Sequence, residues 1–136
     1  MDRRSNPAKA QSVAPAPDEL GRRMFMRGIA LHGALDELEW RRLLLHAATA
    51  LGMSPVGVAA AWRYPLKDGS GGNGTTMVQP ITESFLALDT WPDLGGAYLF
   101  VCSCKPFPPN VLTKTIETFG LQVGEAIGAP DCLRLC

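Results

Sequence analysis

The sequence lacks a long apolar run, an excess of either charge and an apolar segment behind its basic N-terminus. Thirteen basic residues balance thirteen acidic ones, so the basic surplus of a nucleic-acid-binding domain is missing. No apolar segment approaches the roughly 20 residues that a membrane-spanning helix needs. Because Arg3 and Arg4 are not followed by the apolar stretch of a secretory signal, we expect a cytoplasmic protein that binds neither nucleic acid nor membrane.

Cysteine is limited to four residues, all in the last third of the chain: Cys102, Cys104, Cys132 and Cys136. In a cytoplasmic protein, paired cysteines indicate metal binding or reactivity more often than a disulfide framework. The C-x-C and C-x-x-x-C spacings lack the C-x-x-C of most zinc knuckles. We therefore expect no metal site and interpret the cysteines as core residues and a free tail. A small zinc-stabilised interaction domain stays open as an alternative.

The chain divides into a short tail and one domain. Residues 1–17 contain proline, alanine, serine and charged residues but almost no large apolar side chain, which predicts a disordered tail. Residues 18–136 have the length and apolar content of a single domain with its own core. The glycine-rich stretch 67–74 lacks the Lys-Ser/Thr of a phosphate-binding loop, and we expect it to connect two strands of a hairpin.

Hydrophobic patterning predicts strands over 24–31, 56–62, 75–82, 85–88, 97–102 and 121–127. A capping-box-like Asp36-x-x-Glu39 begins one helix, and Pro108-Pro109 introduces another over 110–119. The order strand, helix, four strands, helix, strand predicts an α+β two-layer sandwich, a mainly antiparallel sheet with two helices on one face. The other face must meet solvent, a ligand or a second subunit.

The apolar spacing of the first helix predicts which of its faces is buried. Leucines and an alanine fall at helical spacing and are expected in the core: Leu38, Leu44, Leu45, Ala48 and Leu51. Trp40, Arg41 and Arg42 are expected on the exposed side, and Gly52 is expected to end the helix.

The segment most informative about function runs from Gly74 to Cys104. It contains Glu83-Ser84, then Thr90-Trp91-Pro92-Asp93, then an apolar strand that leads to Cys104. In order and spacing it resembles the core of the prokaryotic S-adenosylmethionine decarboxylases, which read Glu-Ser, Thr-Trp-Pro-Glu and a strand-terminal cysteine. Thr76 stands where the family has a serine. The resemblance in motif covers roughly thirty residues, from Gly74 to Cys104. The resemblance in the order of elements covers residues 21–126.

The resemblance implies self-cleavage between Glu83 and Ser84. In the family, the serine hydroxyl attacks the preceding glutamate carbonyl, and elimination of the resulting ester cuts the chain and leaves a pyruvoyl group. The implied cofactor is therefore a pyruvoyl group derived from Ser84. Its ketone would form a Schiff base with the substrate amine and accept electrons as CO2 leaves. The implied activity is decarboxylation of S-adenosylmethionine for polyamine biosynthesis, and the implied assembly is a homodimer.

The resemblance also implies roles for individual side chains. Cys104 would return a proton to the substrate carbon as a general acid. Trp91 would stack on the adenine, and Asp93 would accept hydrogen bonds from the ribose hydroxyls. Thr76, which takes the place of the family serine, would be a further catalytic residue.

Two positions depart from the family pattern: the histidine after the cleaved serine is Phe85, and the histidine five residues after it is Asp89. The second resembles the base that removes the α-proton during cleavage. A carboxylate can act as such a base when burial raises its pKa, so Asp89 could replace it. Two alternatives therefore stay open. One is an uncleaved relative that binds S-adenosylmethionine or regulates a partner, and the other is a pyruvoyl decarboxylase of another amino acid, such as ornithine or arginine.

Overall fold

The computed structural model describes residues 23–65 and 73–134, and of residues 23, 65, 73 and 129–134 the backbone alone. The predicted tail 1–17 and nearly all of the glycine-rich connection lie outside the described residues. The elements follow in this order: β1 (Arg23–His32), α1 (Glu37–Ala50), β2 (Ala60–Pro65), β3 (Asn73–Ile81), β4 (Ser84–Trp91), the 3-10 turn η3 (Pro92–Leu94), β5 (Gly96–Ser103), α2 (Pro109–Glu117) and β6 (Gln122–Arg134).

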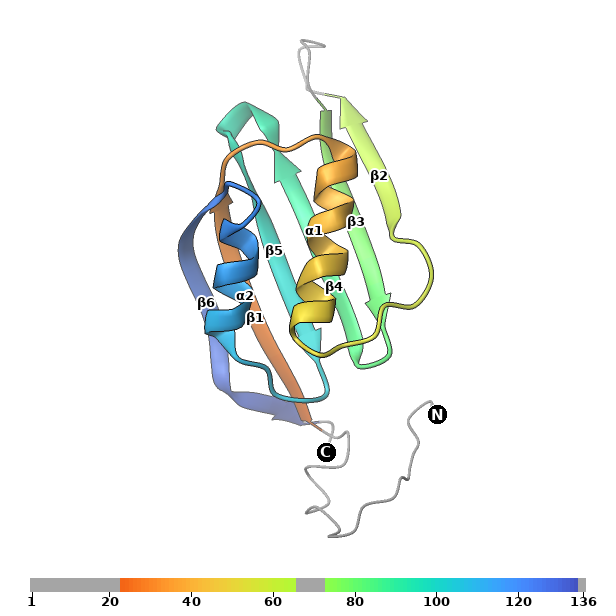
Figure 1. The fold of residues 1–136 in the computed structure, drawn as a ribbon, viewed down its shortest axis with the longest axis vertical. Helices are drawn as coiled ribbons and strands as arrows, with labels where there is room; N and C mark the ends of the chain where they lie inside the picture. Colours follow the sequence, from red (N-terminus) through yellow and green to blue (C-terminus); the bar gives the residue numbers. More distant parts are fainter. Residues whose placement is uncertain (1–22, 66–72, 135–136) are drawn as a thin grey trace, which may run out of the picture.

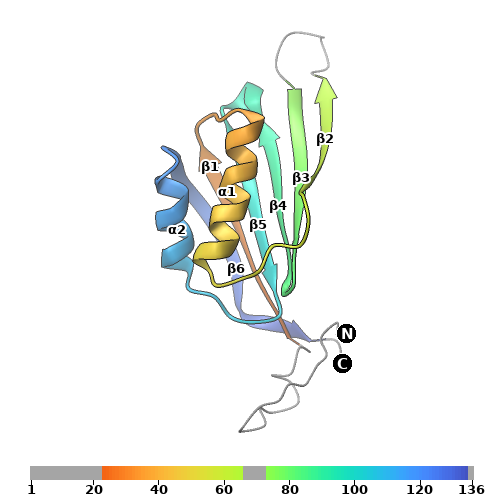
Figure 2. The same cartoon turned by 45° about the vertical axis from the view of Figure 1, so that its right-hand side comes forward.

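The strands form one sheet in the order β2-β3-β4-β5-β1-β6, and every neighbouring pair is antiparallel. Both helices lie on the same face of this sheet and pack against each other (Figures 1 and 2). The predicted two-layer α+β sandwich is therefore confirmed. Within the described residues, no helix is long and apolar enough to cross a membrane.

Helix α1 begins and ends where the sequence predicts, but its buried face is different. The Asp36 side chain accepts the Glu39 N–H at 2.8 Å, and Gly52 follows the helix with a positive φ of 73°. Trp40 is 5% exposed, whereas Leu38 is 65% exposed, so the expected positions of these two residues were wrong. The core stripe comprises Trp40, Leu43, Leu44, Ala47, Ala48 and Leu51.

The error has a geometric cause. Residues spaced by three and four positions share one side of a helix, and the stripe that begins at Trp40 follows this rule. Leu38 and Leu45 are seven residues apart and therefore lie on the same flank, beyond the edge of that stripe; Leu45 is 41% exposed. Leucine at both positions made the flank look like the core face.

Several strand boundaries also differ from the prediction, and the largest difference is at β6, which continues to Arg134 rather than ending at residue 127. Strand β2 begins at Ala60 rather than at residue 56, because Val56 lies in an irregular segment whose N–H reaches the carbonyl of Pro80 at 2.9 Å. Strand β4 continues to Trp91 rather than ending at residue 88, so Thr90 and Trp91 belong to the strand. Strand β3 is internal, and Pro80 is tolerated there because the ladder with β2 ends at Val78.

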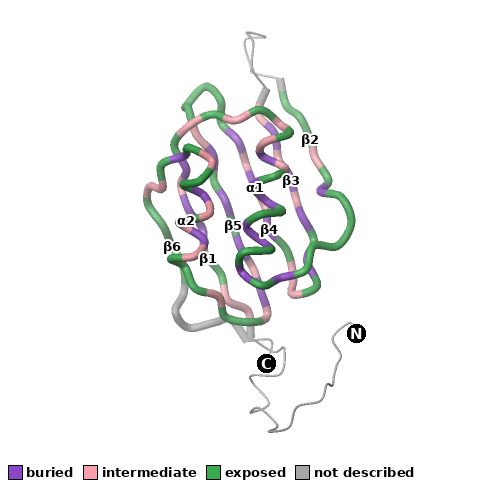
Figure 3. The backbone as a smooth tube through the Cα atoms, in the orientation of Figure 1, coloured by how far each residue is buried: buried purple, intermediate pink, exposed green. Residues whose placement is uncertain are grey.

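The two faces of the sheet differ in what covers them. Side chains that point toward the helices are buried, and buried and exposed positions alternate along β4 and β5 (Figure 3). The opposite face, here called the open sheet face, carries large apolar side chains that are 38–72% exposed: Met26, Trp62, Tyr64, Phe85, Trp91, Tyr98, Phe100 and Ile127.

Candidate functional site

The Glu83-Ser84 peptide lies at a tight turn between β3 and β4. Ile81 pairs with Ser84, so Thr82 and Glu83 form the turn. The backbone of Ser54 holds this turn from the side: its carbonyl accepts the Thr82 N–H at 2.9 Å, and its N–H donates to Glu83 Oε1 at 3.2 Å. Both the main chain and the side chain of the turn are therefore fixed from outside the hairpin.

The carbonyl of Glu83 accepts a hydrogen bond from the backbone N–H of Cys104, at 2.9 Å. Cys104 follows the last residue of β5 directly, and its side chain is half-buried. The next residue anchors this end of the strand, because the Lys105 N–H donates to Ser103 Oγ at 3.0 Å and Lys105 Nζ donates to the Gly52 carbonyl at 2.9 Å. The structure thus brings Glu83, Ser84 and Cys104 together; we call them the turn cluster.

Ser84 is the first residue of β4 and pairs with Ser103 of β5. Its side chain is half-buried and has the same strand parity as Leu86 and Leu88, which point toward the helices. Its φ of 157° is the positive non-glycine value among the described residues, and it is close to the fully extended limit. The serine that would be cleaved therefore lies at the helix-covered face of the sheet, at its β3–β4 turn.

A second group of predicted residues meets on the open sheet face. Asp89 of β4 accepts hydrogen bonds at both carboxylate oxygens, from Thr76 Oγ1 at 3.3 Å and from Trp91 Nε1 at 2.9 Å. Trp91 is 43% exposed, so part of its side chain is open to contact with a ligand. We call Thr76, Asp89 and Trp91 the face cluster. Asp93 lies just beyond it in η3 and is exposed.

The structure does not bring the two clusters together within one chain. Ser84 and Asp89 are five residues apart on a single strand, a separation of about 16 Å at 3.3 Å per residue. An odd separation also places their side chains on opposite faces of the sheet. Asp89 therefore cannot reach the α-proton of Ser84 in its own chain.

Sequence reasoning missed two aromatic residues beside the face cluster. Trp62 of β2 pairs with Thr76, and Tyr98 of β5 pairs with Asp89, so one row across the open sheet face reads Trp62, Thr76, Asp89 and Tyr98. Trp62 is 52% exposed and Tyr98 is 44% exposed. The alternation of Tyr98 with the buried Ala97 and Leu99 was the available signal for that residue, but the register between strands was needed to align Tyr98 and Trp62 with Asp89.

The cysteines give no sign of a metal centre where the structure describes them. Over residues 23–65 and 73–128, no group of three or more histidine, cysteine or acidic side chains is placed to hold an ion. Burial raises the pKa of the Cys102 thiol, which keeps it protonated and unreactive at neutral pH. The side chains of Cys132 and Cys136, which belong to the zinc alternative, lie outside the described residues.

Comparison with known proteins points to one family. The sequence model described as S-adenosylmethionine decarboxylase matches residues 30–125. The crystal structure of the adenosylmethionine decarboxylase from Aquifex aeolicus VF5 is similar in fold, with a TM-score of 0.51 and 19% sequence identity. The match covers 78% of this chain and 90% of that one. No curated protein matches the sequence.

Proposed function

The chain belongs to the S-adenosylmethionine decarboxylase family, and from this membership we propose that it cuts itself between Glu83 and Ser84 and decarboxylates S-adenosylmethionine. The observation that carries the proposal is the hydrogen bond from the Cys104 N–H to the Glu83 carbonyl, at 2.9 Å. This is the carbonyl that the Ser84 hydroxyl must attack. The attack places negative charge on its oxygen, and a fixed backbone donor stabilises that charge.

The residues at the turn suit the cleavage step by step. When Ser84 Oγ bonds to the Glu83 carbonyl carbon, the peptide C–N bond breaks and an ester forms. A base then removes the α-proton of residue 84, and Glu83 leaves as a free carboxylate. The elimination leaves dehydroalanine at residue 84. Hydrolysis of its imine tautomer releases the nitrogen of residue 84 as ammonia and leaves the ketone. The anchored Cys104 N–H can hold the carbonyl oxygen through the first step.

The pyruvoyl group would supply a ketone that condenses with the substrate amine and accepts the electron pair that stays on the substrate when CO2 leaves. The turn fits such a group, because its precursor Ser84 is half-buried beside the half-buried Cys104, which would donate the proton to the substrate carbon. Trp91 would stack on the adenine, and the exposed Asp93 would accept hydrogen bonds from the ribose hydroxyls.

The separation of the clusters supports a homodimer as the active unit. Trp91 lies seven residues beyond Ser84, about 23 Å along the same strand, so one chain cannot present both to a single substrate. A second copy whose open sheet face extends past the β3–β4 turn could bring its own face cluster to the first copy's turn cluster at that end of the sheet. The same contact would cover exposed aromatic and aliphatic side chains that a monomer seldom leaves in contact with water.

Purified protein should release labelled CO2 from carboxyl-labelled S-adenosylmethionine, and much more slowly or not at all from labelled ornithine or arginine. The reason is that Trp91 and Asp93 suit an adenosyl group, which the two amino acids lack. Scintillation counting of trapped CO2 measures all three, with Ser84→Ala as the blank. Preferred release from ornithine or arginine would replace the substrate assignment but keep the pyruvoyl chemistry.

Trp91→Ala should weaken S-adenosylmethionine binding by about 1 kcal/mol, the contribution of ring stacking beyond burial. Trp91→Phe keeps a ring but removes the indole N–H that bonds to Asp89 at 2.9 Å. It should therefore lose less affinity than the alanine variant. Isothermal titration calorimetry measures both, and Trp62→Ala serves as an aromatic control on the same face. Equal affinity in Trp91→Ala and the parent would show that the ring does not touch the ligand.

One observation favours a second function, an uncleaved protein that binds the same ligand. Both oxygens of Asp89 already accept hydrogen bonds, from Thr76 and Trp91. A carboxylate held in this way orients the indole ring, and it lies about 16 Å along β4 from the Ser84 α-proton. In this second function the face cluster binds the adenosyl group, and the Glu83-Ser84 bond stays intact.

A further inference from the structure

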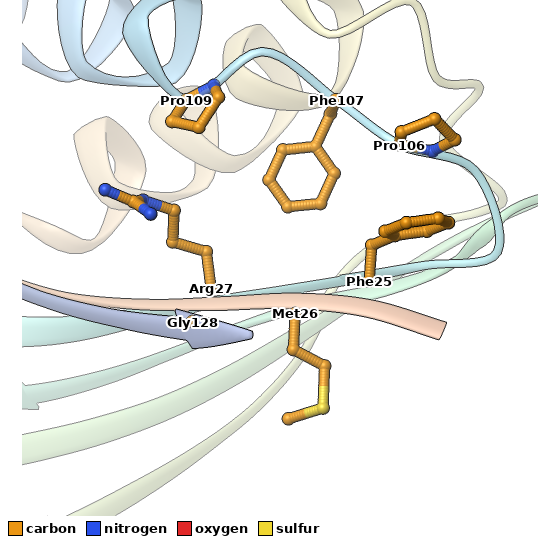
Figure 4. Close-up of a pocket in the computed structure, with 7 residues that line it drawn as sticks. All are labelled: Phe25, Met26, Arg27, Pro106, Phe107, Pro109 and Gly128. Atoms are coloured by element: carbon orange, nitrogen blue, oxygen red, sulfur yellow. The ribbon is translucent and has the colours of Figure 1, made fainter. Parts of the chain in front are cut away.

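A cavity of about 440 Å³ lies on the helix-covered side of the sheet, and no residue of the turn cluster or of the face cluster lines it. Its floor is the beginning of β1, with Phe25 and Arg27, and its roof is the segment between β5 and α2, with Pro106, Phe107 and Pro109 (Figure 4). Phe25 is separated from Ser84 by β5, since Phe25 pairs with Ser103 and Ser103 pairs with Ser84. Two strand spacings amount to about 10 Å, so the cavity neighbours the turn cluster without including its residues.

Arg27 is the charged residue among those that line this cavity. Its Nε is buried and has no hydrogen-bond partner. None of the ion pairs among the described residues involves Arg27. A buried guanidinium N–H without a partner carries its full desolvation cost, and most native proteins avoid this state. The Arg27 Nε–H would therefore be stabilised by a hydrogen-bond acceptor that the described residues of this chain do not provide.

The neighbours of Arg27 explain why no internal acceptor reaches it. Across the strands it pairs with Val101 on one side and with Gly128 on the other. Val101 is fully buried and apolar, and a glycine brings no side chain over the guanidinium. Figure 4 shows Arg27, Phe25 and Phe107 on the same side of β1, around a common space, while Met26 points to the opposite side.

The charge on the roof has the same sign as the floor. Helix α2 begins at Pro109, and no side chain caps its N-terminus. The first turn of a helix carries a partial positive charge that adds to that of a nearby cation. The cavity therefore combines apolar and aromatic walls with positive charge at one end, and it has room for a ligand of several heavy atoms.

We propose that this cavity binds a small organic anion, a carboxylate on an aromatic or branched aliphatic body. The carboxylate would accept from the Arg27 guanidinium, which presents donors in a planar fork suited to two oxygens. The body would lie between Phe25 and Phe107. The site is independent of the proposed decarboxylase activity and does not need the chain to be cleaved.

Phenylacetate is a suitable probe, and the full-length protein should be titrated with it by protein NMR and by thermal unfolding. We expect millimolar binding and a raised Tm, because a ligand that binds only the folded state stabilises it. Arg27→Met should weaken binding at least tenfold, and Arg27→Lys should fall between the two. Arg42→Met is the matched control, since Arg42 is an exposed arginine on α1, and it should bind as the parent does.

Two ligand controls separate the parts of the site. Acetate has the carboxylate without the ring, and 2-phenylethanol has the ring without the charge; each should bind at least tenfold more weakly than phenylacetate. Arg27→Met should remain folded by circular dichroism, because methionine fills the same space without a buried charge. Unchanged phenylacetate affinity in folded Arg27→Met, or binding of 2-phenylethanol as tight as that of phenylacetate, would overturn the proposal. The absence of phenylacetate binding to the parent protein at about 20 mM would overturn it too.

Discussion

Full-length protein should resolve into two chains, residues 1–83 and 84–136, whereas Ser84→Ala should stay a single chain. The Glu83 carbonyl has a fixed donor at 2.9 Å in the Cys104 N–H, and the Ser84 hydroxyl is the nucleophile one residue away. Without that hydroxyl no ester can form, so the effect of the alanine variant should be complete. Intact-mass spectrometry after incubation at neutral pH measures it.

The N-terminus of the second chain distinguishes this chemistry from proteolysis. Ester elimination should leave residue 84 as a ketone, so the 84–136 chain should resist N-terminal sequencing and react with hydrazines. Hydrolysis by a contaminating protease would leave a free serine amine instead. Ser54→Ala is the matched control, because Ser54 contacts the turn through its backbone and the variant keeps that N–H. It should be cut like the parent. A single full-length mass in the parent would leave the uncleaved binding function.

The fold could be predicted largely from local patterns, and its errors were local too. Alternation in β5 and the cap at Asp36 each fix an element without reference to the rest of the chain. The buried face of α1 could not be read in the same way, because Leu38 is apolar yet 65% exposed. Which flank of a helix meets the sheet depends on how the helix is rotated over it, and that is a tertiary property.

The site was predictable as a set of residues but not as an arrangement. The family resemblance singled out Ser84, Asp89 and Cys104 as candidates, yet it carried no information about faces or distances. The bond between the Cys104 N–H and the Glu83 carbonyl depends on the register of β5 against β4. The split into a turn cluster and a face cluster follows from strand pleating, which turns a separation of five residues into opposite faces. The cavity at Arg27 had no sequence signal at all.

Replacing Asp89 by histidine should accelerate cleavage at Glu83-Ser84 by roughly ten- to a hundredfold, or start it if the parent is inert. An aspartate ordinarily has a pKa near 3.9 and a histidine near 6.5, so the imidazole is the stronger base at neutral pH. A positioned base contributes about a hundredfold or more to a proton transfer. Asp89 in addition has both oxygens engaged by Thr76 and Trp91. Time courses over about pH 5 to 9 should show that the cleavage rate of Asp89→His rises through the imidazole pKa and then levels off.

Asp89→Ala should abolish or slow any cleavage seen in the parent. Asp89→Asn keeps an oxygen that can accept the indole N–H, so it separates loss of the base from loss of the Trp91 contact. Equal rates in all four proteins would show that residue 89 is not the base. If none is cut although Asp89→His is folded, another change such as Phe85 has disabled the turn, and the uncleaved binding function is then preferred.

A mixing experiment should show that the base comes from a second copy. Asp89→His,Ser84→Ala has the base but no nucleophile, and Asp89→Ala has the nucleophile but no base. Neither should be cut alone at an appreciable rate, yet in an unfolded and refolded mixture the Asp89→Ala chain should be cut. The reason is the separation of about 16 Å between residues 84 and 89 of one strand. Residue 89 cannot approach residue 84 of its own chain unless β4 unfolds. A second copy can supply the base while both sheets stay intact. If Asp89→His cuts itself but never rescues its partner, the base acts within one chain, and the face-to-face homodimer proposed for the open sheet face must be abandoned.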